Sequence, residues 1–117
     1  MYVTTHAVPV TTAADGSATA YSPVITGEIR SIRYVKTDYT DGVDFTITSE
    51  ATGQSLWTDT NINASETVFP VVAANLAGTG AASTLTERPI ALAADRVKIV
   101  IAAGGNATTG VFHIAVT

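Results

Sequence analysis

The sequence predicts an all-β fold, a single antiparallel β-sandwich or jelly roll of about seven to nine short strands. Short runs of alternating apolar and polar residues recur along the chain, with Gly, Asp and Asn at the turns between them. No segment of about ten residues or more has the 3.6-residue apolar spacing of a helix. The 117 residues have the length of one domain, without an internal repeat or a shift in composition. We therefore expect one domain over residues 1–117.

The N-terminal segment, residues 1–12, is expected to be an edge strand or an arm that lies on a surface. Its apolar residues alternate loosely, and Pro9 has no amide hydrogen to give to a sheet. The sequence Asp15-Gly16-Ser17 is a turn signal of the hairpin kind. A short strand over residues 18–23 follows and ends at Pro23.

The stretch of residues 24–36 needs an irregularity to form one strand. Ile32 and Tyr34 fall on the same face, but Ile29 is out of phase with them. A β-bulge between Ile29 and Ile32 restores the phase, and the alternative is two short strands that divide near Arg30.

The clearest alternation in the chain places Val43, Phe45 and Ile47 on one face and polar residues on the other. A turn at residues 51–53 leads into a second strand over residues 54–60. We therefore expect these two strands to pair antiparallel.

Residues 75–84 form the longest stretch without a strand pattern, because their side chains are mostly small. Long loops in compact domains are often functional, so we expect a loop that is mobile or becomes ordered on contact with a partner, and the alternative is a plain solvent loop. The preceding residues 71–77 are the nearest to a helix, but the flanking Pro70 and Gly78 limit them to about two turns. Residues 85–92 are predicted to form an edge strand, because Pro89 interrupts them.

The last quarter of the chain, residues 95–117, is predicted to be a hairpin with a tight Gly104-Gly105-Asn106 connection. Each strand has three apolar residues on one face: Val97, Ile99 and Ile101 in the first, and Phe112, Ile114 and Val116 in the second. Each set can enter a core together. Val100 adds an apolar residue to the other face, which indicates a central strand.

Composition excludes several classes of function. The chain has no cysteine, so it has no disulfide, zinc–thiolate site or cysteine nucleophile. Its net charge of −4 argues against binding to nucleic acid, which requires clustered Lys and Arg. Residues 1–6 lack the basic start and apolar run of a signal peptide. The sequence has no run of about 18 apolar residues, so we expect no membrane partner.

The polar residues give no pattern typical of an enzyme. The two histidines, His6 and His113, lie outside any nucleophile-elbow motif. Asp38, Asp41 and Asp44 surround a glycine and suggest a calcium loop as an alternative, but the acid spacing of an EF-hand is absent. We expect no catalytic residue, no cofactor and no metal site.

Trp57, the only tryptophan, has two interpretations. With Tyr39 it can form a flat platform on which a sugar stacks, as in a carbohydrate-binding module. The interpretation that we prefer is that Trp57 packs under a loop or in a subunit interface.

Several segments together resemble a family of small virion proteins from the structural gene clusters of tailed phages and prophages. The segments cover most of the chain: TTAADGSATAYSP at 11–23, RYVK at 33–36, GVDFTIT at 42–48, RP at 88–89, RVKIVIAAGGN at 96–106 and GVFH at 110–113. The resemblance implies a non-enzymatic structural protein, and we expect a capsid cement (decoration) protein. Proteins of this kind are small β-rich modules that bridge neighbouring subunits of the capsid.

The resemblance also implies partners and a location. The expected partners are the major capsid protein and further copies of this chain, as a homodimer or homotrimer. The expected location is the capsid surface of the virion, after synthesis in the bacterial host cytoplasm. Candidate contact residues are Tyr2, Val3, Thr5, Trp57, Asn75, Leu76 and Thr79. The alternatives are a tail or head-fibre component and the carbohydrate-binding module.

Overall fold

A computed structural model describes residues 2–117 as ten β-strands, and no residue in this range is helical. The strands are β1 Thr4–Thr11, β2 Ala18–Tyr21, β3 Ile25–Lys36, β4 Val43–Ser49, β5 Ser55–Ile62, β6 Glu66–Val68, β7 Val71–Asn75, β8 Ala82–Asp95, β9 Val97–Ala102 and β10 Thr109–Val116. The predicted all-β class is confirmed. The strands number one more than the upper end of the predicted range, because the segment around residues 71–75 is a strand of its own.

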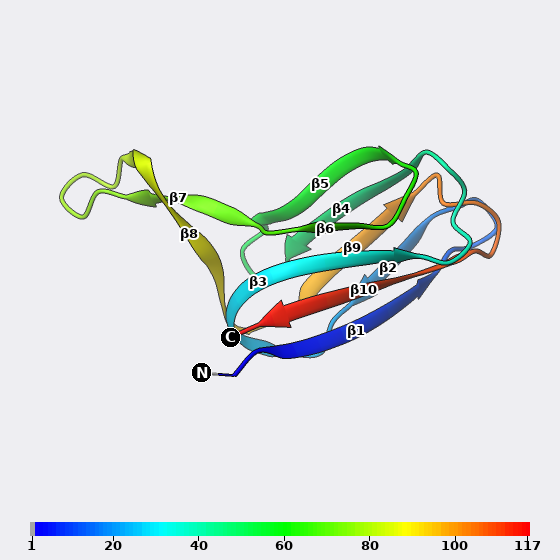
Figure 1. Ribbon diagram of the computed structural model, residues 1–117, viewed down its shortest axis with the longest axis horizontal. Coiled ribbons are helices and arrows are strands. Elements are labelled where there is room, and N and C mark those ends of the chain that lie inside the picture. The colour runs from blue at the N-terminus through cyan, green and yellow to red at the C-terminus, as the bar shows by residue number, and fades with distance from the viewer. Residues whose placement is uncertain (1) are drawn as a thin grey trace.

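The strands form two antiparallel sheets that face each other as a sandwich (Figure 1). The first sheet has the order β1-β10-β3-β8-β7, with β6 also paired to β3. The second sheet has the order β2-β9-β4-β5. Side chains from both sheets form one buried apolar cluster between them.

The two C-terminal strands lie at the centre of the sandwich but do not form the predicted hairpin. The inward residues of β9 and β10 are at most 4% exposed, as their alternation predicts. However, β9 pairs with β2 and β4, whereas β10 pairs with β1 and β3 in the other sheet. The Gly104-Gly105-Asn106 connection therefore crosses from one sheet to the other. The two apolar faces meet across the core instead of lying side by side.

The first turn also connects the two sheets. Asp15-Gly16-Ser17 is a turn, with Gly16 at φ +83° and the Ser17 amide donating to Asp15 Oδ1 at 3.1 Å. It does not close a hairpin, because β1 pairs with β10 and β2 pairs with β9. The Gly104 amide donates to the Gly16 carbonyl at 2.9 Å, so the two crossing connections pack against each other.

Two bulges adjust which side chains face the core. In β3 the register skips Arg30, so Ile29 and Ile32 are both fully buried, and the bulge interpretation is confirmed. In β5 the register skips Leu56, so Leu56 and Trp57 are both buried although they are neighbours. Regular alternation would have placed one of these two side chains in solvent.

Of the two proline-containing segments predicted to be edge strands, one is an edge strand and the other is part of a longer strand. β1 is an edge strand with Pro9, as predicted. Residues 85–92 are not a separate edge strand, because they lie inside the 14-residue β8. The inner part of β8, from Ile90, pairs with β3, and its outer part, up to Pro89, pairs with β7. Pro89 therefore marks the point at which β8 leaves the sandwich.

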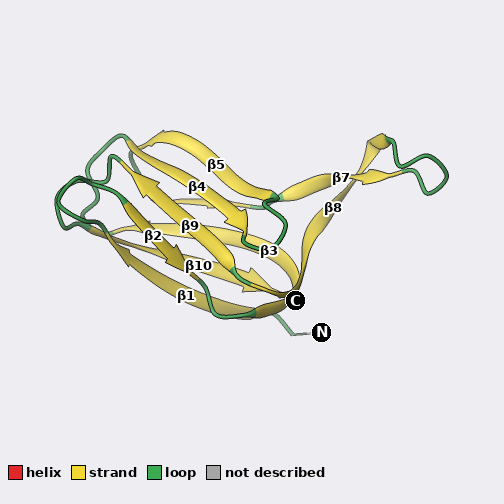
Figure 2. Ribbon diagram, turned by 180° about the vertical axis from the view of Figure 1, so that it is seen from behind, coloured by secondary structure: helices red, strands yellow, loops and turns green. Residues whose placement is uncertain are grey.

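Beyond this point the β7–β8 hairpin extends away from the sandwich, as the two opposite views show (Figures 1 and 2). The molecule measures 50 × 27 × 22 Å along its principal axes. Its radius of gyration is 15.0 Å, against about 13.4 Å for a compact chain of this length. The hairpin accounts for this elongation.

Candidate interaction surface

The projecting hairpin (residues 71–89) consists of β7, a turn and the outer part of β8. Val71 lies opposite Pro89, and Ala73 lies opposite Glu87. At its base, the half-buried Val72 packs against the core of the sandwich. Further out, β7 has no neighbour except β8. An isolated two-stranded hairpin is at most marginally stable in water, so contact with a partner would stabilise this one.

The tip of the projecting hairpin is a turn held by its own hydrogen bonds. The Leu76 amide donates to the Ala81 carbonyl at 2.8 Å, and the Gly80 amide donates to the Leu76 carbonyl at 2.7 Å. Asn75 Nδ2 donates to the Gly80 carbonyl at 2.8 Å. Gly80 has φ +73°, which favours glycine. The predicted loop over residues 75–84 is therefore shorter, because Asn75 belongs to β7 and residues 82–84 belong to β8.

A bulge of several residues lies in β8 just below the tip of the hairpin. Residues 83–86 of β8 face only Ala74 of β7. Ser83 Oγ accepts the amide of Leu85 at 3.1 Å and that of Thr86 at 3.2 Å. These bonds occupy two of the amides that the bulge removes from pairing. The Leu85 side chain is 93% exposed.

The projecting hairpin and its base expose apolar side chains and carry little charge. Four large apolar residues are exposed there: Phe69, Val71, Leu76 and Leu85. The charged residues in this segment are one Glu and one Arg, at positions 87 and 88. Exposed apolar groups with few charges are inexpensive to remove from water, as expected of a protein-binding surface.

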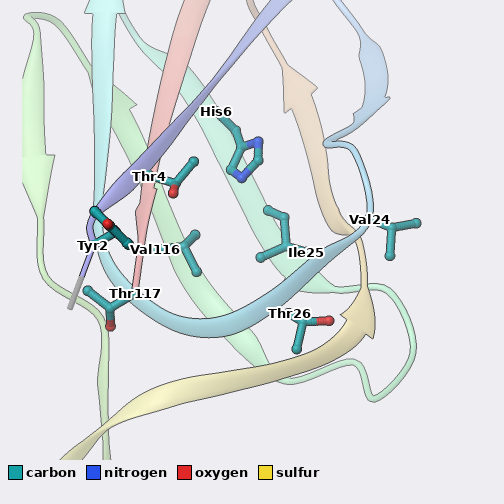
Figure 3. A pocket seen from close by; sticks show the side chains of 8 residues that line it. All are labelled: Tyr2, Thr4, His6, Val24, Ile25, Thr26, Val116 and Thr117. Atoms are coloured by element: carbon teal, nitrogen blue, oxygen red, sulfur yellow. The ribbon is translucent and has the colours of Figure 1, made fainter.

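A small cleft lies where β1 begins and β10 ends (Figure 3). Its lining residues are Tyr2, Thr4, His6, Val24, Ile25, Thr26, Val116 and Thr117. Tyr2 and Val24 lie at opposite sides of it, and His6 projects from β1 toward Ile25 of β3. Its volume is about 150 Å³. A cavity of that size holds one benzene-sized group, which is less than a typical small-molecule site.

The structure places the predicted contact residues in two exposed regions and in the core. Asn75, Leu76 and Thr79 lie at the tip of the projecting hairpin. The exposed N-terminal residues Tyr2, Val3 and Thr5 lie beside or near the cleft. Trp57 does not belong with either group, because its side chain is buried.

Trp57 and Tyr39 do not form the sugar platform of the alternative interpretation, because both side chains are buried in the core of the sandwich. The Trp57 ring packs edge-to-face on Phe45, with ring centroids 5.3 Å apart. Tyr39 is 2% exposed, and its hydroxyl donates to the Val10 carbonyl at 2.6 Å. Burial raises the pKa of Tyr39 and raises the pKa of its neighbour Tyr34 to about 12. These rings are core groups, so neither offers a face to a ligand.

The three aspartates bond to separate parts of the protein instead of converging. Asp38 Oδ1 accepts the Thr109 amide, and Asp44 Oδ1 accepts the Asn61 amide at 3.0 Å. Asp41 forms an ion pair with a lysine. Within residues 2–117, no three His, Cys, Asp or Glu side chains lie together as a metal site would require.

Sequence reasoning missed Phe69 and Leu85, the most exposed apolar side chains of this surface. A signal was present for Leu85, which is a single large apolar residue among Thr, Ser and charged neighbours. Such a residue has no apolar partner on its own face of the strand, so it has no route into a core.

Among residues 2–117, no helix has the length and apolar character needed to cross a bilayer. No protein-family model and no curated protein matches this sequence.

Proposed function

We propose that this chain is a non-enzymatic structural protein of a tailed-phage virion. In this role it is a capsid cement protein that binds the outside of the shell and bridges neighbouring major capsid protein subunits. The projecting hairpin is the observation that carries the proposal. It extends from a packed sandwich, exposes Leu85 with Phe69 exposed at its base, and has almost no charge to desolvate.

The division between sandwich and hairpin suits a bridging role. The sandwich has a continuous buried core and supplies a rigid body. The projecting hairpin presents apolar side chains at a distance from that body, so one copy is able to contact a surface beyond its own footprint (Figure 2). The cleft lined by Tyr2 is a second contact region, on the sandwich itself.

Weak contacts are sufficient for such a protein. A capsid presents many identical sites, and a homodimer or homotrimer that contacts several of them gains effective affinity from simultaneous binding. The protein would be made in the host cytoplasm and carried on the capsid surface. Self-association is therefore part of the proposal.

The test is the number of copies in purified particles of the phage that encodes the chain. Quantitative mass spectrometry gives this number relative to the major capsid protein. We expect hundreds of copies in a fixed ratio to the capsid protein. A few dozen copies would assign the chain to a tail, neck or fibre instead, and no copies would refute a virion role.

A matched pair of variants tests the contact surface. Leu85→Asp places a charge on the projecting hairpin, and Thr58→Asp places the same charge on an exposed position of β5. Purified variants are added to shells that lack the protein, and the bound copies are counted. We expect Leu85→Asp to lower occupancy and Thr58→Asp to leave it unchanged. Equal occupancy of both variants would exclude Leu85 from the contact.

A further inference from the structure

We infer that the free edge of β7 is the surface on which two copies of this chain pair. The two strands would run antiparallel across a two-fold axis and join the hairpins into a four-stranded sheet. The inference gives a geometry to the self-association in the proposed function and rests on that part of it. It does not depend on where in a virion the protein is placed.

The first argument is that the other strand edges are protected against pairing. β1 carries Pro9, which removes an amide donor, and β2 and β6 are only four and three residues long. β5 carries Asp59 and is irregular, with a bulge at Leu56 and Asn61 at φ +58°. Proline, charge, bulges and short length are the features by which edge strands avoid other chains.

Within the projecting hairpin, the two edges differ in the same way. The outer part of β8 contains the bulge at residues 83–86, where Ser83 Oγ occupies two amides. β7, with the sequence Val-Val-Ala-Ala-Asn, has neither a proline nor a charge, and the extra residues of the bulge all lie in β8. Its outer edge is therefore the one suited to adding a strand.

The second argument is the fit between two copies. In an antiparallel pair centred on Ala73, Ala73 faces Ala73 of the other copy. The numbers of facing residues then always add up to 146, so Val71 faces Asn75 of the other copy. By the same count, Leu76 of one copy lies opposite Pro70 of the other, and facing residues of an antiparallel pair lie on the same side of the sheet. Leu76, which is exposed in the single chain, would therefore be covered by the half-buried Pro70 of the other copy.

Charge does not prevent a second copy from being the occupant. Each chain has a net charge of −4, so two bodies repel each other at short range. The five paired residues of β7 place the bases of the two hairpins about 14 Å apart along the strands, beyond the screening length of about 8 Å at physiological salt. The paired segment itself carries no charge.

The absence of cysteine from the sequence permits a direct test. Facing residues of an antiparallel pair have Cα atoms about 4.5–5.5 Å apart, which is compatible with a disulfide. Single cysteines are introduced at each position from 71 to 75, and Thr58→Cys on β5 is the control. We expect mild oxidation to cross-link Ala73→Cys, or its immediate neighbour in β7, into a dimer much faster than Thr58→Cys.

Sedimentation equilibrium of the unmodified chain and of a charge variant completes the test. We expect a dimer, and we expect Ala73→Lys to weaken dimerisation by roughly tenfold, because two like charges then face each other. Thr58→Lys is the matched control and should leave the equilibrium unchanged. A monomer at high micromolar concentration, with no β7 cysteine cross-linking faster than the control, would overturn the inference. Copy number in particles is a separate measurement, so failure of the virion proposal would be recognised independently.

Discussion

Replacing Gly110 by alanine places a methyl group against two tyrosine rings that have no room to move. An added Cβ would lie 2.5 Å from Tyr39 Cε2 and 2.9 Å from Tyr34 Cε1. Favourable carbon–carbon contacts are about 3.5–4.0 Å, so the methyl group is about 1 Å too close. Tyr34 is fully buried against Phe45 and Phe112, and the hydroxyl of Tyr39 is fixed to the Val10 carbonyl.

The magnitude follows from two opposing effects. Overpacking a core costs typically 1–3 kcal/mol, and this contact belongs at about 3 kcal/mol because both rings are held. Gly110 does not have a positive φ, so alanine gains about 0.4–1 kcal/mol by restricting the unfolded chain. The net loss is about 2 kcal/mol, which lowers the melting temperature by about 8 °C for a domain of this size.

Thermal unfolding followed by circular dichroism measures this loss. Gly78→Ala is the control, because Gly78 has no positive φ and an added Cβ there has no heavy atom within 4 Å. We expect that control to melt at or slightly above the temperature of the unmodified protein. If Gly110→Ala melted within about 1 °C of its parent, the packing of the two tyrosines on this glycine would be refuted.

Three further substitutions test the core. Trp57→Ala should lower the free energy of unfolding by about 3–5 kcal/mol in chemical denaturation, and a loss below about 1 kcal/mol would show that the ring is not a core group. Tyr34→Phe should be neutral or stabilise by up to about 1 kcal/mol, because Tyr34 Oη is buried without a hydrogen-bond partner among residues 2–117; a clear loss of stability would contradict that environment. The hydrogen bond from Ser49 lowers the pKa of Asp95. The stabilisation that ionised Asp95 gives to the folded state is therefore present above its unfolded pKa of about 3.9, and it is lost as pH falls through the lower folded pKa. Asp95→Asn should therefore have a shallower loss of stability in acid, and an unchanged pH profile would argue against this role.

Strand alternation was predictable where one face of a strand is buried. Val43, Phe45 and Ile47 alternate with polar residues, and all three are at most 1% exposed. The bulge in β3 was predictable for the same reason. Two buried isoleucines, Ile29 and Ile32, are out of phase unless one residue between them is skipped.

Pairing between distant segments was not predictable in the same way. The apolar faces of β9 and β10 are compatible with a hairpin in one sheet and equally with a crossing between two sheets. The choice depends on β1, β2, β3 and β4, which supply the actual neighbours. The bulge that buries both Leu56 and Trp57 likewise depends on the register with β4, which local sequence does not encode.

Residues 75–84 of the projecting hairpin had no strand pattern for a physical reason. A period of two appears in sequence only when one face of a strand is buried and the other is wet. Beyond its base, β7 and the outer part of β8 have no layer packed on them, so small residues occupy both faces. The large apolar residues that do occur there, Leu76 and Leu85, lie at the turn and at the bulge. A hairpin with this composition buries too little to stabilise itself. Contact with a second molecule, as proposed above, would bury its exposed apolar side chains.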